Sequence, residues 1–275
     1  MRLFSRIKIP TPPARSVVAF LTTSFFIVLF VILPTNSYAR NAVIHAREDL
    51  MLAVSPSAAR AYAYGIRHLD ARHAVDYDFE RAAMLFTKAH EMDPRHPYVY
   101  HALARIAFLR GDLDAALGYI DAQIRYHSDV TPASYYMRGL IKGFMKDYNG
   151  AADDYGTYLE LDPTNWAAAT DRAWVLLQAG RPHEALSTID SVYDLWRTNP
   201  WILNMRATAL YETGDFALAR ETALEAARAV AVVTEEEWLR AYPGNDPLVA
   251  ADGILQFQEA VRSNVRRISD AAQPQ

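Results

Sequence analysis

The feature that most constrains this chain is a segment that recurs along it at a nearly fixed interval. The segment DYNGAADDYGTYLELDP, residues 147–163, has four weaker copies, and an alanine near the middle recurs at spacings of 34, 35, 34 and 34 residues. These alanines are Ala82, Ala116, Ala151, Ala185 and Ala219. A constant period of this length is typical of chains that stack one small structural unit several times.

Each unit is predicted to form two helices. Apolar residues lie three before, four after and seven after the alanine, for instance Tyr148, Tyr155 and Tyr158, and such offsets share one helical face. A second small residue stands twelve positions before the alanine, at Ala104, Gly139, Ala173 and Ala207. Small side chains at both points let antiparallel helices approach closely, and a leucine at either would cost about 1–3 kcal/mol by overpacking.

Turn residues separate the predicted helices. Gly111, Gly180 and Gly214 stand where a left-handed backbone conformation is expected between the two helices of a unit. Pro94 and Pro163 are expected to end the second helix of their units.

This joint pattern resembles the tetratricopeptide repeat family, with residues 135–163 as the best match. The resemblance implies an all-α, right-handed superhelical solenoid of five helix pairs. The expected repeats are 58–96, 97–130, 131–165, 166–199 and 200–231. The first repeat departs from the pattern by five extra residues between Gly65 and Ala82, and the second, fourth and fifth lack the closing proline.

Residues 232–275 are expected to cap the solenoid and to end in a frayed tail. Thr234 and Glu237 form a capping box at the start of a helix that Pro243-Gly244 ends. A last helix is predicted to begin at Asp246-Pro247 and to carry one apolar stripe, which covers the open end of a repeat array. The stripe consists of Ile254, Phe257, Val261, Val265 and Ile268.

The first 39 residues are interpreted as a membrane-targeting segment. Residues 17–33 carry no charge and would reach roughly 25 Å as a helix, close to the hydrocarbon thickness of a bilayer. The 40 N-terminal residues hold five basic side chains and no acidic one, which predicts a cytoplasmic N-terminus and an extracytoplasmic repeat domain. Residues 40–57 then form a linker, with a short helix over 41–54.

Two forms of this segment stay open. Residues 17–33 are either a retained single-pass anchor in the cytoplasmic membrane or part of a signal peptide. The small residues around Ala39 would suit cleavage after that residue, which would give an exported soluble protein.

Composition and missing motifs argue against several function classes. The chain has no cysteine, which excludes disulfides and thiolate chemistry, and beyond residue 40 it carries 23 basic and 32 acidic side chains, which disfavours nucleic-acid binding. No phosphate-binding loop, nucleophile elbow or zinc-protease motif is present, since His183-Glu184 lacks the second histidine at Ser187. His90, His96 and His101 fall on different predicted elements, so we expect no metal site, no cofactor and no catalytic residues.

What remains is a binding surface. In the family that this chain resembles, the first helix of each repeat lines a concave groove that holds extended peptides or partner helices. Tyrosine, tryptophan and arginine are the residue types that dominate binding energy at such surfaces. By the resemblance, the groove residues are Tyr98, His101, Arg105, Phe108, Tyr136, Leu140, Trp174, Trp201, Asn204 and Tyr211.

Some relatives in that family grip a terminal carboxylate with lysine, asparagine and arginine side chains in the groove. The matching positions here include Met137, Ala167 and Asp171, so that clamp is not assembled. The sequence therefore predicts a non-catalytic, membrane-tethered scaffold for a protein or peptide partner of unknown identity. The alternatives are a cell-envelope enzyme or glycan-binding protein that uses the same groove, or a structural subunit of an envelope assembly.

Overall fold

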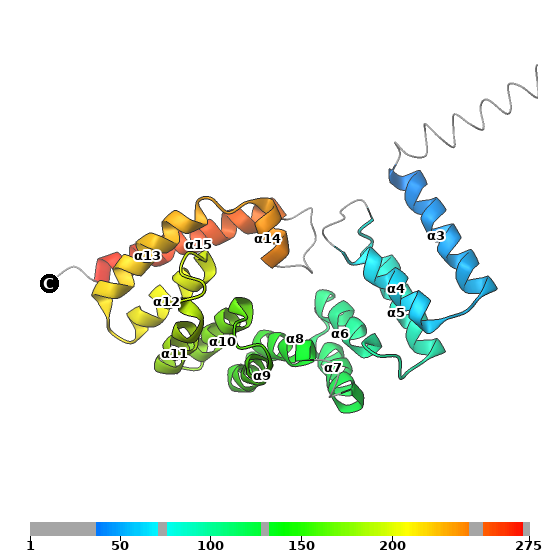
Figure 1. Cartoon of the computed structure of the whole chain (residues 1–275), viewed down its shortest axis with the longest axis horizontal. Coiled ribbons are helices and arrows are strands. Elements are labelled where there is room, and N and C mark those ends of the chain that lie inside the picture. Colours follow the sequence, from blue (N-terminus) through cyan, green and yellow to red (C-terminus); the bar gives the residue numbers. More distant parts are fainter. Residues whose placement is uncertain (1–36, 71–75, 128–131, 242–249, 272–275) are drawn as a thin grey trace, which may run out of the picture. The chain divides into compact units, whose positions relative to one another are not determined.

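The computed structural model describes residues 37–70, 76–127, 132–241 and 250–271, and these residues form thirteen helices and no strand (Figure 1). The chain divides into two compact units, residues 1–56 and residues 57–275. The described part of the first unit is one helix, α3 (Ser37–Val54). It begins four residues before the predicted linker helix and ends at the predicted residue.

The second unit consists of five helix pairs followed by two further helices. The first helices of the pairs are α4 (Ala58–His68), α6 (Val99–Leu109), α8 (Pro132–Phe144), α10 (Trp166–Gln178) and α12 (Pro200–Glu212). The second helices are α5 (Phe79–Met92), α7 (Leu113–His127), α9 (Tyr148–Leu161), α11 (Pro182–Tyr193) and α13 (Phe216–Val230). The last two are α14 (Glu235–Ala241) and α15 (Ala250–Ala271).

Close approach at the small residues holds each pair together, as predicted. All five recurrent alanines are fully buried, and so are their partners Ala104, Ala173 and Ala207. At Gly139 a Cβ atom would lie 3.1 Å from the ring of Tyr155, and at Gly65 it would lie 2.5 Å from the ring of Phe86. The aromatic side chains of the second helices therefore occupy the space that a larger residue in the first helix would need.

The turn inside a pair is the same in the second to fifth repeats. Gly111, Gly180 and Gly214 have positive φ angles of 76°, 71° and 91°, which confirms the predicted left-handed conformation. The residue after each glycine donates its backbone N–H to the carbonyl five residues earlier, for instance Asp112 to Ala107 at 3.0 Å. In the third repeat Lys146 occupies this position with a φ of 66°, although a lysine side chain disfavours that region.

An aspartate caps the second helix in four of the five pairs. Asp78, Asp112, Asp147 and Asp215 each accept the backbone N–H three residues later, at 2.9–3.2 Å. In the fourth pair Arg181 stands at this place without a side-chain cap, and Pro182 begins the helix instead. The turn and the cap together set where each second helix starts.

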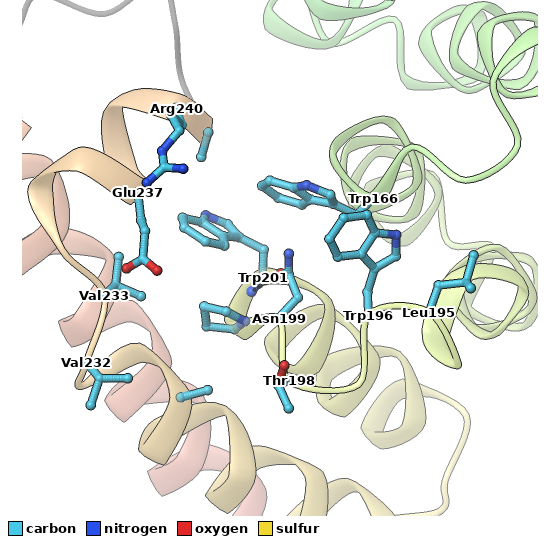
Figure 2. A pocket seen from close by; sticks show the side chains of 13 residues that line it. Trp166, Leu195, Trp196, Thr198, Asn199, Trp201, Val232, Val233, Glu237 and Arg240 are labelled. Atoms are coloured by element: carbon cyan, nitrogen blue, oxygen red, sulfur yellow. Dashed lines mark hydrogen bonds between the residues drawn. The ribbon is translucent and has the colours of Figure 1, made fainter. Parts of the chain in front are cut away.

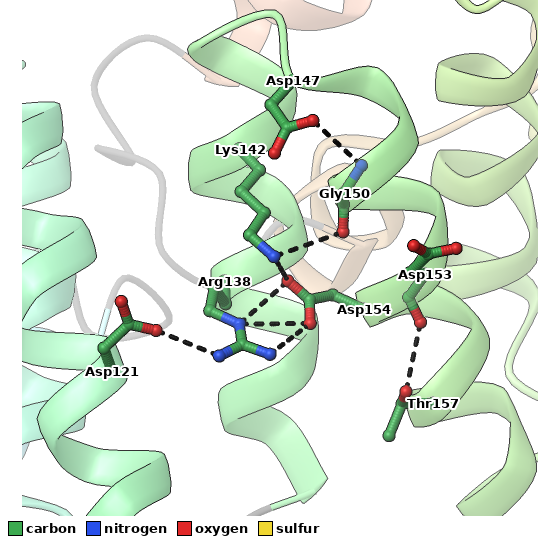
Figure 3. A network of polar contacts seen from close by, with 8 residues as sticks. All are labelled: Asp121, Arg138, Lys142, Asp147, Gly150, Asp153, Asp154 and Thr157. Carbon is green, nitrogen blue, oxygen red and sulfur yellow. Dashed lines mark hydrogen bonds and ion pairs between the residues drawn. The ribbon is translucent and has the colours of Figure 1, made fainter.

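A polar network joins three consecutive helices at the middle of the array (Figure 3). The Arg138 guanidinium of α8 binds both carboxylate oxygens of the buried Asp154 in α9 and reaches Asp121 in α7 at 3.0 Å. Lys142 adds a second ion pair to Asp154 at 2.7 Å. The hydrogen bond to Asp154 is the main reason that the pKa of Arg138 is raised. Two cations thus compensate the one buried carboxylate.

The C-terminal helices cover the last pair. Thr234 and Glu237 form the predicted capping box of α14, with reciprocal hydrogen bonds of 2.9 and 3.2 Å. The apolar stripe of α15 packs as predicted: Val261 and Ile268 are fully buried against α12 and α13. Pro243-Gly244 and Asp246-Pro247, which were expected to end α14 and to start α15, lie outside the described residues.

The predicted membrane segment, residues 17–33, also lies outside the described residues. Within the ranges that the structure describes, no helix has both the length and the apolar character that crossing a bilayer requires. Ser37-Tyr38-Ala39, the expected cleavage sequence, forms the first turn of α3.

The left-handed Lys146 yields a stability prediction. We expect Lys146→Gly to raise the free energy of unfolding by about 0.5–1 kcal/mol. Glycine removes the steric strain of a side chain at positive φ, and its greater conformational entropy in the unfolded chain offsets only part of this stabilisation. Thermal and urea unfolding followed by circular dichroism would measure the change.

The matched control is Arg110→Gly, one residue before Gly111 in the second repeat. Arg110 has a right-handed conformation, with a φ of -80°, so glycine there should lower stability. Equal destabilisation by both substitutions would contradict the assignment of strain to Lys146.

Candidate functional site

The first helices of successive repeats adjoin one another and form one continuous face of the second unit. Helix α8 contacts α6 and α10, α12 contacts α10, and α15 contacts α12 as the next first helix would. All ten predicted groove residues belong to α6, α8, α10 and α12 or, for Tyr98, to the residue before α6. We call this surface the first-helix face.

Its N-terminal part is polar and partly buried. The backbone N–H of His101 donates to Gln123 of α7 at 3.0 Å, and its ring Nδ1 lies 3.2 Å from Ser134 Oγ. Burial, together with the neighbouring Arg105, lowers the pKa of His101 to about 4, so the ring is neutral at physiological pH. Burial lowers the pKa of Arg105 as well, and nearby Tyr77 and Tyr62 oppose that shift.

Tyr98, which precedes α6, is 38% exposed and has a left-handed backbone, with a φ of 70°. In the first repeat, Tyr62 of α4 is partly buried against Phe86 and His96. Burial raises the pKa of Tyr62 to about 12, so its hydroxyl keeps its proton.

The middle of the face carries a hydrogen-bonded carboxyl group. Tyr136 of α8 donates its hydroxyl to Asp171 of α10, and its ring packs edge-on against Tyr155 and Tyr158. Burial raises the pKa of Asp171 to about 6, and the hydrogen bond from Tyr136 opposes this rise. Leu140, one turn further along α8, packs into the core with Ile141 and Phe108.

Three aromatic side chains, two exposed and one half-buried, lie near the turn ends of the first helices. Phe108 of α6 and Phe144 of α8 pack edge-to-face with their ring centroids 5.0 Å apart. Gly143 brings α8 against α10, since a Cβ at that glycine would lie 3.9 Å from the Trp174 ring. Phe144 is 63% exposed and Trp174 is 44% exposed. We call Phe108, Phe144 and Trp174 the aromatic strip.

The strip has apolar neighbours at both of its ends. Leu109 and Met145 are each exposed by more than a third, and Tyr148 of α9 packs edge-on against Trp174 at 5.9 Å. Large apolar side chains that remain exposed and contiguous across three repeats are typical of a protein interaction surface.

The C-terminal helices cover the last third of the predicted groove. Trp201 is 8% exposed, because Phe257 of α15 stacks on it at 5.1 Å and Trp238 of α14 lies 6.2 Å away. Asn204 accepts a hydrogen bond from Asn264 of α15 at 3.0 Å.

Tyr211 lies against the same helix. The guanidinium of Arg267 is 4.7 Å from the centre of the Tyr211 ring and forms an ion pair with Glu212 at 3.0 Å. Helix α15 therefore takes the place on α12 where a ligand was expected. The sequence alone could not predict this contact. The apolar stripe shows that one side of α15 is buried, but it does not show which helix α15 packs against.

Sequence reasoning missed Phe144, the most exposed aromatic of the strip. The signal was present, since Phe144 stands four residues after the predicted groove residue Leu140 and therefore on the same helical face. Phe144 is the last residue of α8, and a periodic pattern predicts the end of a helix less well than its middle. The sequence analysis therefore did not include it.

The three histidines considered as metal ligands have separate surroundings. His90 packs against Tyr100, His96 packs against Tyr62, and His101 contacts Ser134. Over the described ranges, no group of three histidine, aspartate or glutamate side chains is placed to hold a metal ion.

The fold defines a class, a helical-repeat protein built from stacked antiparallel helix pairs. Tetratricopeptide repeat family models match residues 76–137, 136–200 and 200–225, so that together they cover residues 76–225. The chain therefore belongs to the tetratricopeptide repeat family. A comparison with curated protein sequences found no match.

Solved structures of MamA share the fold. MamA AMB-1 superposes with a TM-score of 0.54 at 17% identity, over 63% of this chain and 99% of that chain. A second MamA crystal structure gives 0.52 at 14% identity, over 62% and 92%. YrrB, described as a TPR protein with an unusual peptide-binding site, covers 66% of this chain and 96% of its own at 18% identity, but its TM-score of 0.47 is too low to transfer that site.

The raised pKa of Asp171 predicts a pH-dependent variant. The folded pKa of about 6 exceeds the ordinary value of 3.8, so the folded state binds the proton more tightly and stability falls as pH rises between those values. Asp171→Asn removes this cost and keeps an acceptor for Tyr136. We expect it to raise the free energy of unfolding by roughly 2 kcal/mol near pH 7.5 and by little near pH 4.

Denaturant unfolding at both pH values would measure the difference. Asp153→Asn, on the exposed side of α9, removes the same charge and should change stability by less than about 0.5 kcal/mol at either pH. A gain from Asp171→Asn that is equal at both pH values would show that the carboxyl group is not destabilised by burial.

Proposed function

We propose that this protein is a non-catalytic scaffold that binds a partner protein through the aromatic strip on its first-helix face. The observation that carries the proposal is the exposure of Phe144 and Trp174 on the adjacent first helices α8 and α10, with Phe108 of α6 packed edge-to-face against Phe144. The partner segment presents apolar side chains, as an extended peptide or as one face of a helix.

The energetics favour this surface over the rest of the predicted groove. Burying a large aromatic side chain that is exposed in the free protein contributes about 1.5–3 kcal/mol, and Phe144 and Trp174 both have that area available. Trp201 and Tyr211 offer much less, because α15 already covers them. The repeat family itself supports a role in protein interaction, because its members are typically interaction scaffolds.

Charge around the strip indicates what else the partner needs. Lys146 follows the strip directly after α8 and is exposed, whereas Gly111 stands at the equivalent place of the second repeat. An acidic residue beside the apolar side chains of the partner would complement Lys146.

A site-specific crosslinking experiment tests the proposal. A photoreactive phenylalanine analogue at position 144 or 174 of the full chain, expressed in the source cells, should crosslink one discrete partner. The same analogue at Leu161, an exposed residue of α9, is the control and should not. Trp174→Ala should abolish the crosslink from position 144 while leaving the circular dichroism spectrum unchanged. Removal of an aromatic side chain that dominates an interface costs about 2 kcal/mol or more of binding free energy, which is roughly a thirtyfold loss of affinity. If the analogue at position 161 crosslinks the same partner as the analogue at position 144, the aromatic strip is not the binding surface.

We further propose that residues 17–33 attach the repeats to the cytoplasmic membrane, with the repeat unit on the extracytoplasmic side. The uncharged run and the basic residues before it support this orientation. A retained anchor also keeps α3 whole, whereas cleavage after Ala39 would remove its first turn.

N-terminal sequencing of the mature protein, combined with alkaline extraction of membranes, tests the attachment. A retained anchor gives a chain that begins near Met1 and stays in the membrane pellet. A chain that begins at Arg40 and is found in the soluble fraction would replace the anchor by a cleaved export signal.

A further inference from the structure

A cavity lies away from the aromatic strip, where α10, α12 and α14 meet (Figure 2). Its volume is about 590 Å³, within the roughly 300–1,000 Å³ of small-molecule sites. Indole rings from two helices and one connecting loop form its wall: Trp166 begins α10, Trp196 follows α11 and Trp201 lies in the first turn of α12. The aromatic strip contributes no residue to this cavity.

The indole wall is held in place by contacts behind it. The Nε1–H of Trp196 donates to the Thr164 carbonyl at 2.9 Å, and Trp201 stacks on Phe257. The centroids of Trp166 and Trp201 are 5.1 Å apart, and those of Trp166 and Trp196 are 6.5 Å apart. A ligand therefore meets a rigid surface, which lowers the entropic cost of binding.

The rim of the cavity offers planar polar groups. Asn199 uses its Oδ1 to cap α12, and no hydrogen bond is recorded for its Nδ2 within the described residues. Glu237 accepts the Thr234 hydrogen bonds through Oε2, so that Oε1 is available as an acceptor. Arg240 is 3.1 Å from Glu236 through one nitrogen and has further N–H donors.

The geometry points to a binding site for a neutral sugar, of the size of a hexose disaccharide. A pyranose ring has a face of C–H groups that stacks on an indole and an edge of hydroxyl groups that both donate and accept hydrogen bonds. The cavity supplies the matching parts: an indole wall, and a rim with donors at Asn199 and Arg240 and an acceptor at Glu237. Other ligand classes fit less well.

If the ligand were a single apolar side chain of a partner protein, it would fill only part of the cavity and would leave the polar groups of the rim without hydrogen-bond partners. A charged ligand would find no net charge to complement, because Glu237 and Arg240 compensate each other at the rim. The half-exposed state of the wall suits an open-ended saccharide, since Trp196 is 36% exposed while Trp201 forms the covered base.

Titration of the full chain with cellobiose, chitobiose and maltose tests the site. Saturation-transfer NMR and intrinsic tryptophan fluorescence should show saturable binding of at least one of the three. Trp196→Ala should weaken that binding on the order of tenfold or more, because it removes the accessible stacking face. Trp196→Phe keeps an aromatic face and should restore part of the loss, which separates stacking from a change in folding.

Two matched variants complete the test. Trp174→Ala removes an exposed tryptophan of the aromatic strip and should leave sugar binding within about twofold. Arg240→Met removes the N–H donors of this side chain from the rim and should weaken binding, whereas Arg197→Met, which breaks the similar exposed pair with Asp194, should not.

The inference is overturned if none of the three disaccharides binds saturably, or if Trp174→Ala weakens binding as much as Trp196→Ala does. It is also overturned if a phenylalanine-containing tripeptide, and no sugar, binds in a manner that depends on Trp196. The scaffold proposal is independent of these outcomes, because it rests on crosslinking at residues 144 and 174.

Discussion

The close contact between paired helices at small residues is the interaction on which the rest of this structure depends. Where Gly139 meets the Tyr155 ring, a methyl group would lie at 3.1 Å, tighter than ordinary van der Waals contact allows. The alanines of the second helices are buried in the same contacts. The small residues stand at equivalent positions in the successive pairs, so the pairs have a similar geometry and stack with their first helices side by side. The side of the first helices that faces away from the second helices then forms a continuous face.

Polar groups also stabilise this arrangement. Asp154 is buried, and leaving its charge unpaired would be costly, so Arg138 and Lys142 tie α8 to α9, while Asp121 extends the network to α7. Asp171 and His101 lie on the first-helix face, and burial disfavours the charged form of both. The pKa shifts have opposite signs, because one group is an acid and the other a base. Each group is held by a neighbour, Asp171 by Tyr136 and His101 by Ser134.

The C-terminal helices divide the first-helix face into a covered part and an open part. Helix α15 packs on α12 where a further repeat would stand, so that Trp201, Asn204 and Tyr211 belong to the capped end. Helix α14 adds Glu237 and Arg240 to the tryptophan-lined cavity. The aromatic strip stays open on the second, third and fourth repeats, where Phe144 and Trp174 are exposed and Phe108 is half-buried.

The sequence by itself determined the helix pairs, because their signals depend only on residues close together in the chain. These signals are the repeat period, the small contact residues, the left-handed glycines and the capping box of Thr234 and Glu237. It also predicted that Phe108 and Trp174 belong to the first helices, and the structure places them in α6 and α10. Only the tertiary structure decided which of those residues remain accessible. Exposure depends on what packs opposite a side chain, and for Trp201 that is Phe257, 56 positions further along the chain. The tryptophan cavity has the same origin, because Trp166, Trp196 and Arg240 share no periodic pattern and are brought together only when α14 folds back beside α12.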